Sequence, residues 1–354
     1  MKFSIQLSAY YPDKSYGGDR LYADMLEQAV LGEKLGFDAV SITEHHLINI
    51  LLMPAPLTFA TKIAAHTSHI KIMTSIVVLP LHDMRIFAGE VVVADIFCDG
   101  RLLLGVGRGA YAYEIERMGV PMDETQARFN ESLDVLQALL SREEVAWDGD
   151  YYQFKPLTIM PRPTQSGGPP MMMAVMNPEG IYQCTKRGFH IQTTPLAGDH
   201  QLLVDQVSAF NRGKDELGVR GEELTLSLSR VSYLAEGHRD ASAKLDLAYD
   251  YYKRFDNVFT GPGVVCAGMI EPLPRRQSKA ELGESLLICG ASEMIDQLGE
   301  YAELGIDRLI LNVNFGAEQS ETLDMLQRFS EDVMPHFEVT GCPSGVVGFS
   351  HQVK

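Results

Sequence analysis

Short apolar runs alternate with amphipathic stretches along most of the chain. Between residues 20 and 35, apolar side chains recur at helical spacing and Gly36 follows, so this segment predicts a helix that ends there. Residues 70–79 are rich in β-branched side chains and predict a buried strand. Together these patterns predict strands at 3–9, 37–42, 70–79, 101–106, 171–176, 189–193, 224–231 and 308–313. They predict helices at 20–35, 54–66, 85–97, 123–140, 178–187, 200–217, 241–255, near 294–302 and near 322–337.

The order of these elements favours one fold class. Strand and helix alternate eight times in chain order, which favours an α/β protein with a (β/α)8 TIM barrel over an open sheet. Residues 147–154 predict a small surface hairpin around Asp148-Gly149. Residues 260–285 interrupt the alternation and are rich in Gly and Pro, so they predict an insertion late in the barrel, either a lid or an unstructured loop. We therefore expect one barrel domain over 1–340, with an insertion at about 259–286, and a C-terminal tail at 341–354.

Composition and charge exclude several classes of protein. The 354 residues include 30 Lys and Arg against 47 Asp and Glu, a net charge of −17 that argues against a nucleic-acid binder. No apolar run approaches the roughly 20 residues of a membrane span, and the N-terminus does not read as an export signal. The five cysteines are scattered without a C-x-x-C pair, so neither a disulfide framework nor a zinc site is expected. The expected compartment is the cytoplasm.

The first candidate for chemistry is Glu44-His45-His46, directly after the second predicted strand. In a barrel, that position lies on the C-terminal face, where catalytic residues collect. Histidine exchanges protons near neutral pH, so the motif is typical of a proton-transfer site. The competing interpretation is a surface histidine pair at the start of a helix. A metal site is less favoured, because adjacent residues seldom both ligate one ion.

Two further motifs indicate anion binding. Residues 105–111 formally fit the dinucleotide pattern G-x-G-x-x-G/A, but they follow the fourth strand rather than the first strand of a unit. A loop that lets a ligand approach the backbone, with Arg108 binding phosphate, competes with a tight turn carrying a solvated arginine. Asn177 and Pro178 predict a helix start whose free N–H groups, up to Gly180, could also bind phosphate.

Several ordered motifs together resemble the bacterial luciferase-like flavin-dependent monooxygenase family. The resemblance runs from about Lys2 to Phe337. It rests on the opening strand, on Gly36 to Val40 leading into Glu44-His45-His46, and on Thr74 to Pro80, Gly100 to Gly109 and Asp332 to Pro335. It implies a (β/α)8 barrel that binds reduced FMN at its C-terminal mouth. The resemblance also implies a homodimer formed through helices beside the second and third strands.

The same resemblance implies roles for individual residues. His45 matches the catalytic histidine, which supports a flavin C4a-hydroperoxide formed with O2, and Glu44 matches its acidic neighbour. Ser75 and Ile76 match a non-proline cis peptide beneath the flavin ring. The other cofactor-binding matches are Arg108 at the phosphate, Tyr111 in the pocket, and Met176, Asn177 and Gly180 in the phosphate loop.

Three departures limit what the resemblance implies. Gly107 stands where luciferase has a reactive cysteine, and the phosphate loop has fewer side-chain donors. Gln126 stands where a second phosphate arginine is found, with Arg128 nearby as a substitute. We therefore expect a general monooxygenase of a small organic substrate rather than a light-emitting enzyme. Because no nicotinamide-binding domain is visible, FMNH2 is expected to come from a separate flavin reductase.

Two alternatives stay open at this point. A deazaflavin-dependent oxidoreductase on the same barrel would move hydride without oxygen. A non-catalytic flavin-binding partner subunit would stabilise an active homologue. Loss of His45 would be the expected mark of such a subunit, and His45 is present.

Overall fold

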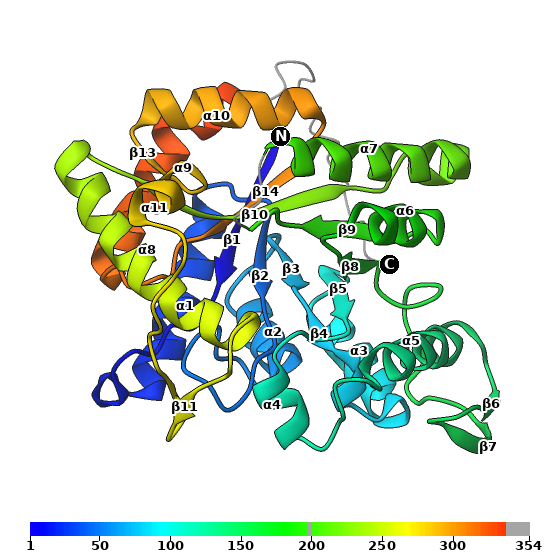
Figure 1. Cartoon of the computed structure of the whole chain (residues 1–354). Coiled ribbons are helices and arrows are strands. Elements are labelled where there is room, and N and C mark those ends of the chain that lie inside the picture. The colour runs from blue at the N-terminus through cyan, green and yellow to red at the C-terminus, as the bar shows by residue number, and fades with distance from the viewer. Residues whose placement is uncertain (197–199, 338–354) are drawn as a thin grey trace, which may run out of the picture.

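The computed structural model describes residues 1–196 and 200–337 (Figure 1). Eight parallel strands close into a barrel, because each pairs with the next and the last pairs with the first. In barrel order they are β1 (Lys2–Leu7), β2 (Ala39–Ile42), β3 (Lys71–Thr74), β5 (Leu102–Gly107), β8 (Met171–Ala174), β9 (His190–Thr193), β10 (Leu226–Leu234) and β14 (Arg308–Asn312). The predicted (β/α)8 barrel is confirmed.

Helices surround the barrel and connect successive strands (Figure 1). They are α1 (Gly18–Lys34), α2 (Pro56–Ala64), α3 (Met84–Phe97), α4 (Ala112–Arg117), α5 (Thr125–Ser141), α6 (Pro178–Lys186), α7 (His200–Leu217), α8 (His238–Phe259), α9 (Lys279–Glu284), α10 (Ala291–Leu304) and α11 (Gln319–Asp332). Short strands β6 (Val145–Asp148) and β7 (Gln153–Leu157) pair antiparallel, which confirms the predicted hairpin. No helix within the described ranges is long and apolar enough to cross a membrane.

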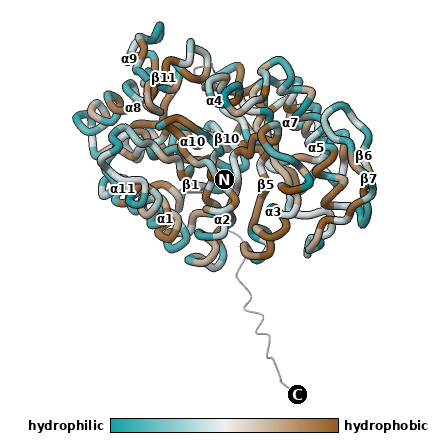
Figure 2. Tube along the Cα trace, turned by 90° about the horizontal axis from the view of Figure 1, so that it is seen from below, coloured by the Kyte–Doolittle hydropathy of each residue, from teal (hydrophilic) through white to brown (hydrophobic). Residues whose placement is uncertain are grey.

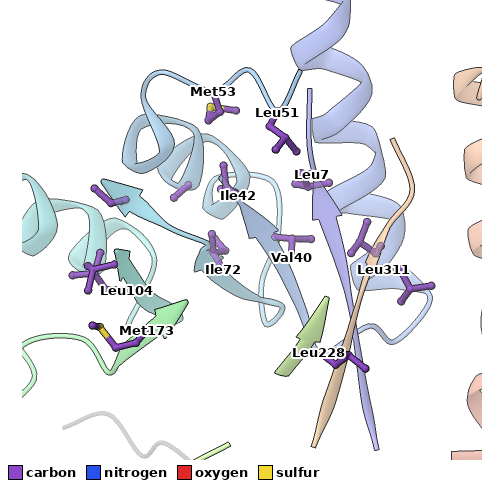
Figure 3. Packing of buried hydrophobic residues seen from close by; sticks show 14 of the residues in the cluster. Leu7, Val40, Ile42, Leu51, Met53, Ile72, Leu104, Met173, Leu228 and Leu311 are labelled. Carbon is purple, nitrogen blue, oxygen red and sulfur yellow. The ribbon is translucent and has the colours of Figure 1, made fainter. Parts of the chain in front are cut away.

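The main apolar core lies between the strands and the helices. Val40, Ile42 and Ile72 belong to it, and Figure 3 shows them beside apolar side chains of neighbouring strands. In Figure 2 the hydrophobic colour is concentrated around β5 and β10, while the outer turns of α8 and α11 are hydrophilic. Ala39, Met73 and Ile310 form a small second cluster, separate from this core. Because strand side chains alternate between faces, the helices cover the outward face of each strand, and the inward side chains fill the barrel below its C-terminal mouth.

The structure differs from the predicted elements in two places. Residues 70–79 do not form one strand: β3 ends at Thr74, the Ser75–Ile76 peptide bond is cis, and the chain resumes as β4 (Val77–Val78). The apolar pattern of this segment predicted burial correctly, but it carries no signal for an interruption. After β5, where the sequence predicted no regular element, the structure has α4.

The inserted segment is built from small elements. Strands β11 (Val265–Cys266) and β12 (Met269–Ile270) form an antiparallel hairpin, followed by α9 and by β13 (Leu287–Cys289), which pairs in parallel with the end of β10. Helix α9 begins with a capping box in which Ser278 and Glu281 exchange hydrogen bonds. The predicted tail at 341–354 lies outside the described residues.

Candidate active site at the C-terminal mouth of the barrel

A cavity of about 320 Å³ lies at the C-terminal ends of the barrel strands. Its volume falls within the ~300–1,000 Å³ typical of small-molecule sites. The structure brings seven of the predicted site residues to its wall, namely Glu44, His45, Ser75, Ile76, Arg108, Tyr111 and Met176. The placement of these residues at the carboxyl ends of strands is where barrel enzymes carry their active sites.

Glu44 is a buried carboxylate held by three donors. His46 Nε2 and His82 Nε2 each lie 2.8 Å from its Oε1, and the Val78 N–H donates to Oε2 at 2.6 Å. Burial alone raises the pKa of Glu44, but these hydrogen bonds outweigh burial and hold it at about 2. In return, the hydrogen bond to Glu44 raises the pKa of His46. The carboxylate therefore joins the β2 loop to the segment after the cis peptide bond.

His45 is oriented by a second carboxylate that the sequence analysis missed. Its Nδ1 lies 2.7 Å from Glu114 Oε1, and the His46 backbone N–H donates to Glu114 Oε2 at 2.7 Å. The ring stacks on Tyr111 with centroids 4.2 Å apart. Because an ionised carboxylate only accepts hydrogen bonds, Nδ1 carries the proton and Nε2 is the nitrogen available to a ligand.

Glu114 escaped prediction because α4 is only six residues long and has no apolar period of its own. The carboxylate is buried, whereas Glu116 and Arg117 on the same helix are exposed. Its contact with His45 joins positions 69 residues apart. The one local signal was an acid directly after the glycine-rich segment of a barrel strand, a place where functional side chains gather.

The glycine-rich strand end allows close packing. A Cβ at Gly105 would lie 2.0 Å from the Thr74 carbonyl oxygen, and one at Gly107 would lie 2.7 Å from Ile76 Cδ1. These glycines let β5 approach the segment that contains the cis peptide bond. Any side chain at Gly105 would clash with the Thr74 backbone, so this position requires glycine.

Arg108 leaves β5 at the cavity wall as an exposed cation. Its Nη1 lies 3.2 Å from Thr125 Oγ1, which leaves most of its five donors for a ligand. The cavity floor beside it contains Ser75, whose hydroxyl donates to Gln192 Oε1 at 2.5 Å.

The predicted phosphate loop forms the N-terminal end of α6. Asn177 caps this helix, because its Oδ1 accepts a hydrogen bond from the Gly180 N–H at 2.6 Å. Met176 lines the cavity, and its carbonyl accepts a hydrogen bond from Gln206 Nε2 at 2.6 Å. The start of α6 is therefore adjacent to the cavity, although Asn177 and Gly180 are not part of its wall.

Arg128 lies apart from this cavity. On α5 it forms an ion pair with Glu124, with Nη2 and Oε2 2.9 Å apart, and its guanidinium lies over the Tyr151 ring. It lines a separate depression beside His82. Gln126 is hydrogen-bonded to Asn130 on the exposed face of the same helix.

The residues at the cavity wall fit a flavin nucleotide. Arg108 offers free donors for a phosphate, and Ile76 and Tyr111 offer apolar surface for a planar ring. Thr193 Oγ1 is buried at the wall without a hydrogen-bond partner in the described chain, a donor that the polar edge of a ring could use.

Comparison with known proteins finds relatives over nearly the whole chain. An oxygenase component of a flavin-dependent trigonelline monooxygenase from Acinetobacter baylyi is 28% identical over 346 residues, 95% of this chain and 96% of that protein. An F420-dependent glucose-6-phosphate dehydrogenase from Beutenbergia cavernae is 24% identical and covers 88% of this chain and 92% of its own length. The crystal structure of a Streptomyces bottropensis monooxygenase superposes with a TM-score of 0.83 at 24% identity, over 96% of this chain and 100% of that one.

The match also extends to a family model. The model of the luciferase-like monooxygenases matches residues 1–308, most of the chain. This chain belongs to the luciferase-like monooxygenase family.

Proposed function

We propose that this chain is the oxygenase component of a two-component monooxygenase in the cytoplasm, which uses reduced FMN and O2 to oxygenate a small organic substrate. A separate flavin reductase supplies the FMNH2. The observation that carries the proposal is the pairing of His45 with Glu114 beneath Tyr111 at the cavity wall. The trigonelline monooxygenase relative, an oxygenase component by name, supports the two-component arrangement.

The residues that would hold the cofactor form two groups. Arg108 and the first turn of α6 would hold the phosphate, because free guanidinium and N–H donors favour an anion at a helix start. Ser75 and Ile76 would support the ring from the cavity floor. When bound, reduced FMN supplies the two electrons that activate O2 without a metal.

His45 would accept and return the proton that this reaction requires. Its Nδ1 hydrogen bond to Glu114 fixes the ring, and the ionised carboxylate stabilises the imidazolium that forms when Nε2 takes a proton. Burial raises the pKa of the Tyr111 hydroxyl well above its ordinary value, so this neighbour stays protonated and uncharged. The pair can therefore accept or return one proton at Nε2 inside the cavity.

Aromatic side chains of α8 would exclude water from the site. Tyr251, Tyr252, Phe255 and Phe259 all line the cavity, and Phe255 and Phe259 stack with centroids 5.2 Å apart. Exclusion of water protects reactive oxygenating species and strengthens electrostatic interactions at the site.

In the test, anaerobic protein loaded with FMNH2 is mixed with oxygenated buffer in a stopped-flow spectrometer. The proposal predicts a transient absorbance distinct from reduced and oxidised flavin, lasting longer than free FMNH2 takes to oxidise. Flavin that binds but oxidises as it does in free solution would favour a non-catalytic partner subunit.

An F420-dependent oxidoreductase is the second candidate, supported by the F420-dependent relative. A parallel titration with reduced and oxidised F420 separates the two cofactors. Binding of F420 at least tenfold tighter than FMN, without an oxygen-dependent transient, would replace the monooxygenase proposal.

We also propose a homodimer, formed through α3. This helix exposes Ile86, Val93, Ile96 and Phe97, with exposed fractions of 65%, 38%, 38% and 63%. Apolar groups in such a patch are typical of a protein contact. A Phe97→Glu variant is expected to shift the mass measured by light scattering from dimer to monomer, and a wild-type monomer would contradict the proposal.

A further inference from the structure

A second, larger cavity of about 1,320 Å³ lies outside the first and opens toward the inserted segment. The two cavities share five wall residues, which define their junction: Leu196, Arg230, Tyr252, Phe255 and Phe259. Four of them are apolar or aromatic, and Arg230 is the one charged side chain. Arg230 is therefore the charged side chain that the walls of both cavities have in common.

Arg230 comes from β10 and has donors to spare. Its Nη1 donates to the Leu196 carbonyl at 3.0 Å, while its Nε is buried and has no hydrogen-bond partner among the described residues. A buried guanidinium donor without an acceptor costs free energy, so such groups commonly face a ligand. Because Arg108 lies with the proposed phosphate site, Arg230 is a second cation within reach of the inner cavity.

Arg275 adds a second guanidinium from the inserted segment. Its side chain lines the outer cavity and is only 4% exposed. Its Nη2 donates to Gln277 Oε1 at 2.9 Å, but its Nη1 is buried without a partner in the described part of the chain. Asp256 Oδ2 lies 3.2 Å from its Nε and offsets part of the charge.

Tyr252 connects the two arginines. The Arg275 guanidinium lies 4.9 Å from the centre of the Tyr252 ring. Burial raises the pKa of the Tyr252 hydroxyl to about 12, and the positive charges of Arg230 and Arg275 oppose that rise. The hydroxyl stays protonated near neutral pH, so Tyr252 adds a neutral donor to the wall that the two cavities share.

We propose that the junction of the two cavities binds the carboxylate of the organic substrate, with Arg230 as the main donor and Arg275 as the second. The inference rests on the proposed monooxygenase function and names the class of substrate. A carboxylate accepts paired N–H donors from guanidinium groups, and the aromatic wall suits a planar ring. The substrate is therefore a small ring-containing carboxylic acid whose ring points into the inner cavity toward His45.

The test compares benzoate with benzamide, which share a shape and differ in charge. Calorimetric titration of the FMN-loaded protein is expected to give tighter binding of benzoate. Arg230→Gln should weaken benzoate about 10- to 100-fold, the range for a charge-assisted contact, and change benzamide less than threefold. Arg275→Gln should have a smaller effect in the same direction. Arg239→Gln removes the same charge from an exposed position of α8 and should leave the ratio unchanged.

Two results would overturn the inference. Equal binding of benzoate and benzamide to the wild type would contradict an anion site. Loss of FMN affinity in Arg230→Gln with an unchanged benzoate-to-benzamide ratio would assign Arg230 to the cofactor. Should Arg230→Gln fail to fold, Arg230→Lys keeps the charge but loses the planar fork, so it should weaken benzoate and leave benzamide nearly unchanged. Unchanged benzoate binding to a folded Arg230→Lys would also contradict the inference.

The two proposals fail in different ways. Benzoate selectivity measured on the protein without FMN does not depend on oxygen chemistry. An absent oxygen-dependent transient with intact benzoate selectivity would contradict the monooxygenase and leave the anion site standing. A normal transient without any benzoate selectivity would contradict the anion site alone.

Discussion

Buried polar side chains on the two sides of the barrel mouth differ in how far their hydrogen bonds are satisfied. On the β2 and β5 side, Glu44 and Glu114 are fully engaged with the histidines around them. On the β10 side, Arg230 and Arg275 keep buried donors without partners in the described chain. A completed network fixes geometry before any ligand arrives, whereas unpartnered donors gain their acceptors from the ligand. This difference is the basis on which we propose proton chemistry for the first side and substrate recognition for the second.

The largest effect should come from a substitution of Glu44, whose hydrogen bonds complete the network on the β2 and β5 side. Glu44→Gln is expected to lower the free energy of unfolding by about 3 kcal/mol, since the folded structure lowers the pKa of this carboxyl from 4.5 to about 2. Chemical denaturation at several pH values measures it. Glu143→Gln, at an exposed position, is the control and should change stability by less than about 0.5 kcal/mol.

The pH dependence of that effect has a definite sign. Stability from the lowered pKa of Glu44 is present above pH 4.5 and is lost as the pH falls toward 2. Stability from the raised pKa of His46 is present below pH 6.5 and is lost as the pH rises through its folded-state value. The difference between wild type and Glu44→Gln should therefore be greatest between about pH 5 and 6, and a difference that grows toward pH 9 would contradict the account.

A smaller effect is expected from the positioning residue Glu114. Glu114→Gln keeps a hydrogen-bond acceptor but removes the charge beside His45, so the lifetime of the oxygen-dependent transient should change about tenfold or more. Its pH profile should also change, which a purely structural role would not cause. Glu114→Asp should restore part of the wild-type behaviour, and Glu116→Gln on the exposed face of α4 is the matched control.

Variants of Arg108 test whether the two cations of the inner cavity, Arg108 and Arg230, bind different groups. Arg108→Gln should weaken FMN about tenfold and leave riboflavin, which has no phosphate, nearly unchanged. Arg128→Gln should leave both affinities unchanged, because Arg128 pairs with Glu124 outside the cavity. Fluorescence titration measures all four affinities. Weaker FMN binding by Arg128→Gln would instead support the phosphate-binding role that the sequence predicted for Arg128.

Local patterns predicted the features that depend on neighbours in the chain. The strand and helix periods were sufficient for the barrel, and the barrel placed Glu44-His45-His46 at its C-terminal face. The features that were missed depend on contacts between distant segments. Glu114 meets His45 only after β5 has closed against β3, and Arg275 meets Tyr252 only through the inserted segment. The cis peptide bond interrupts an apolar run that looks continuous in the sequence.

We propose above all that His45, oriented by Glu114, prepares the cavity for oxygen chemistry. The most direct measurement is the stopped-flow lifetime of the transient formed from FMNH2 and O2 in wild type and in His45→Ala, at equal FMN occupancy. The account predicts a long-lived transient in the wild type and a lifetime shortened by roughly 10²-fold or more in the variant. Equal lifetimes in the two proteins would contradict the role of His45.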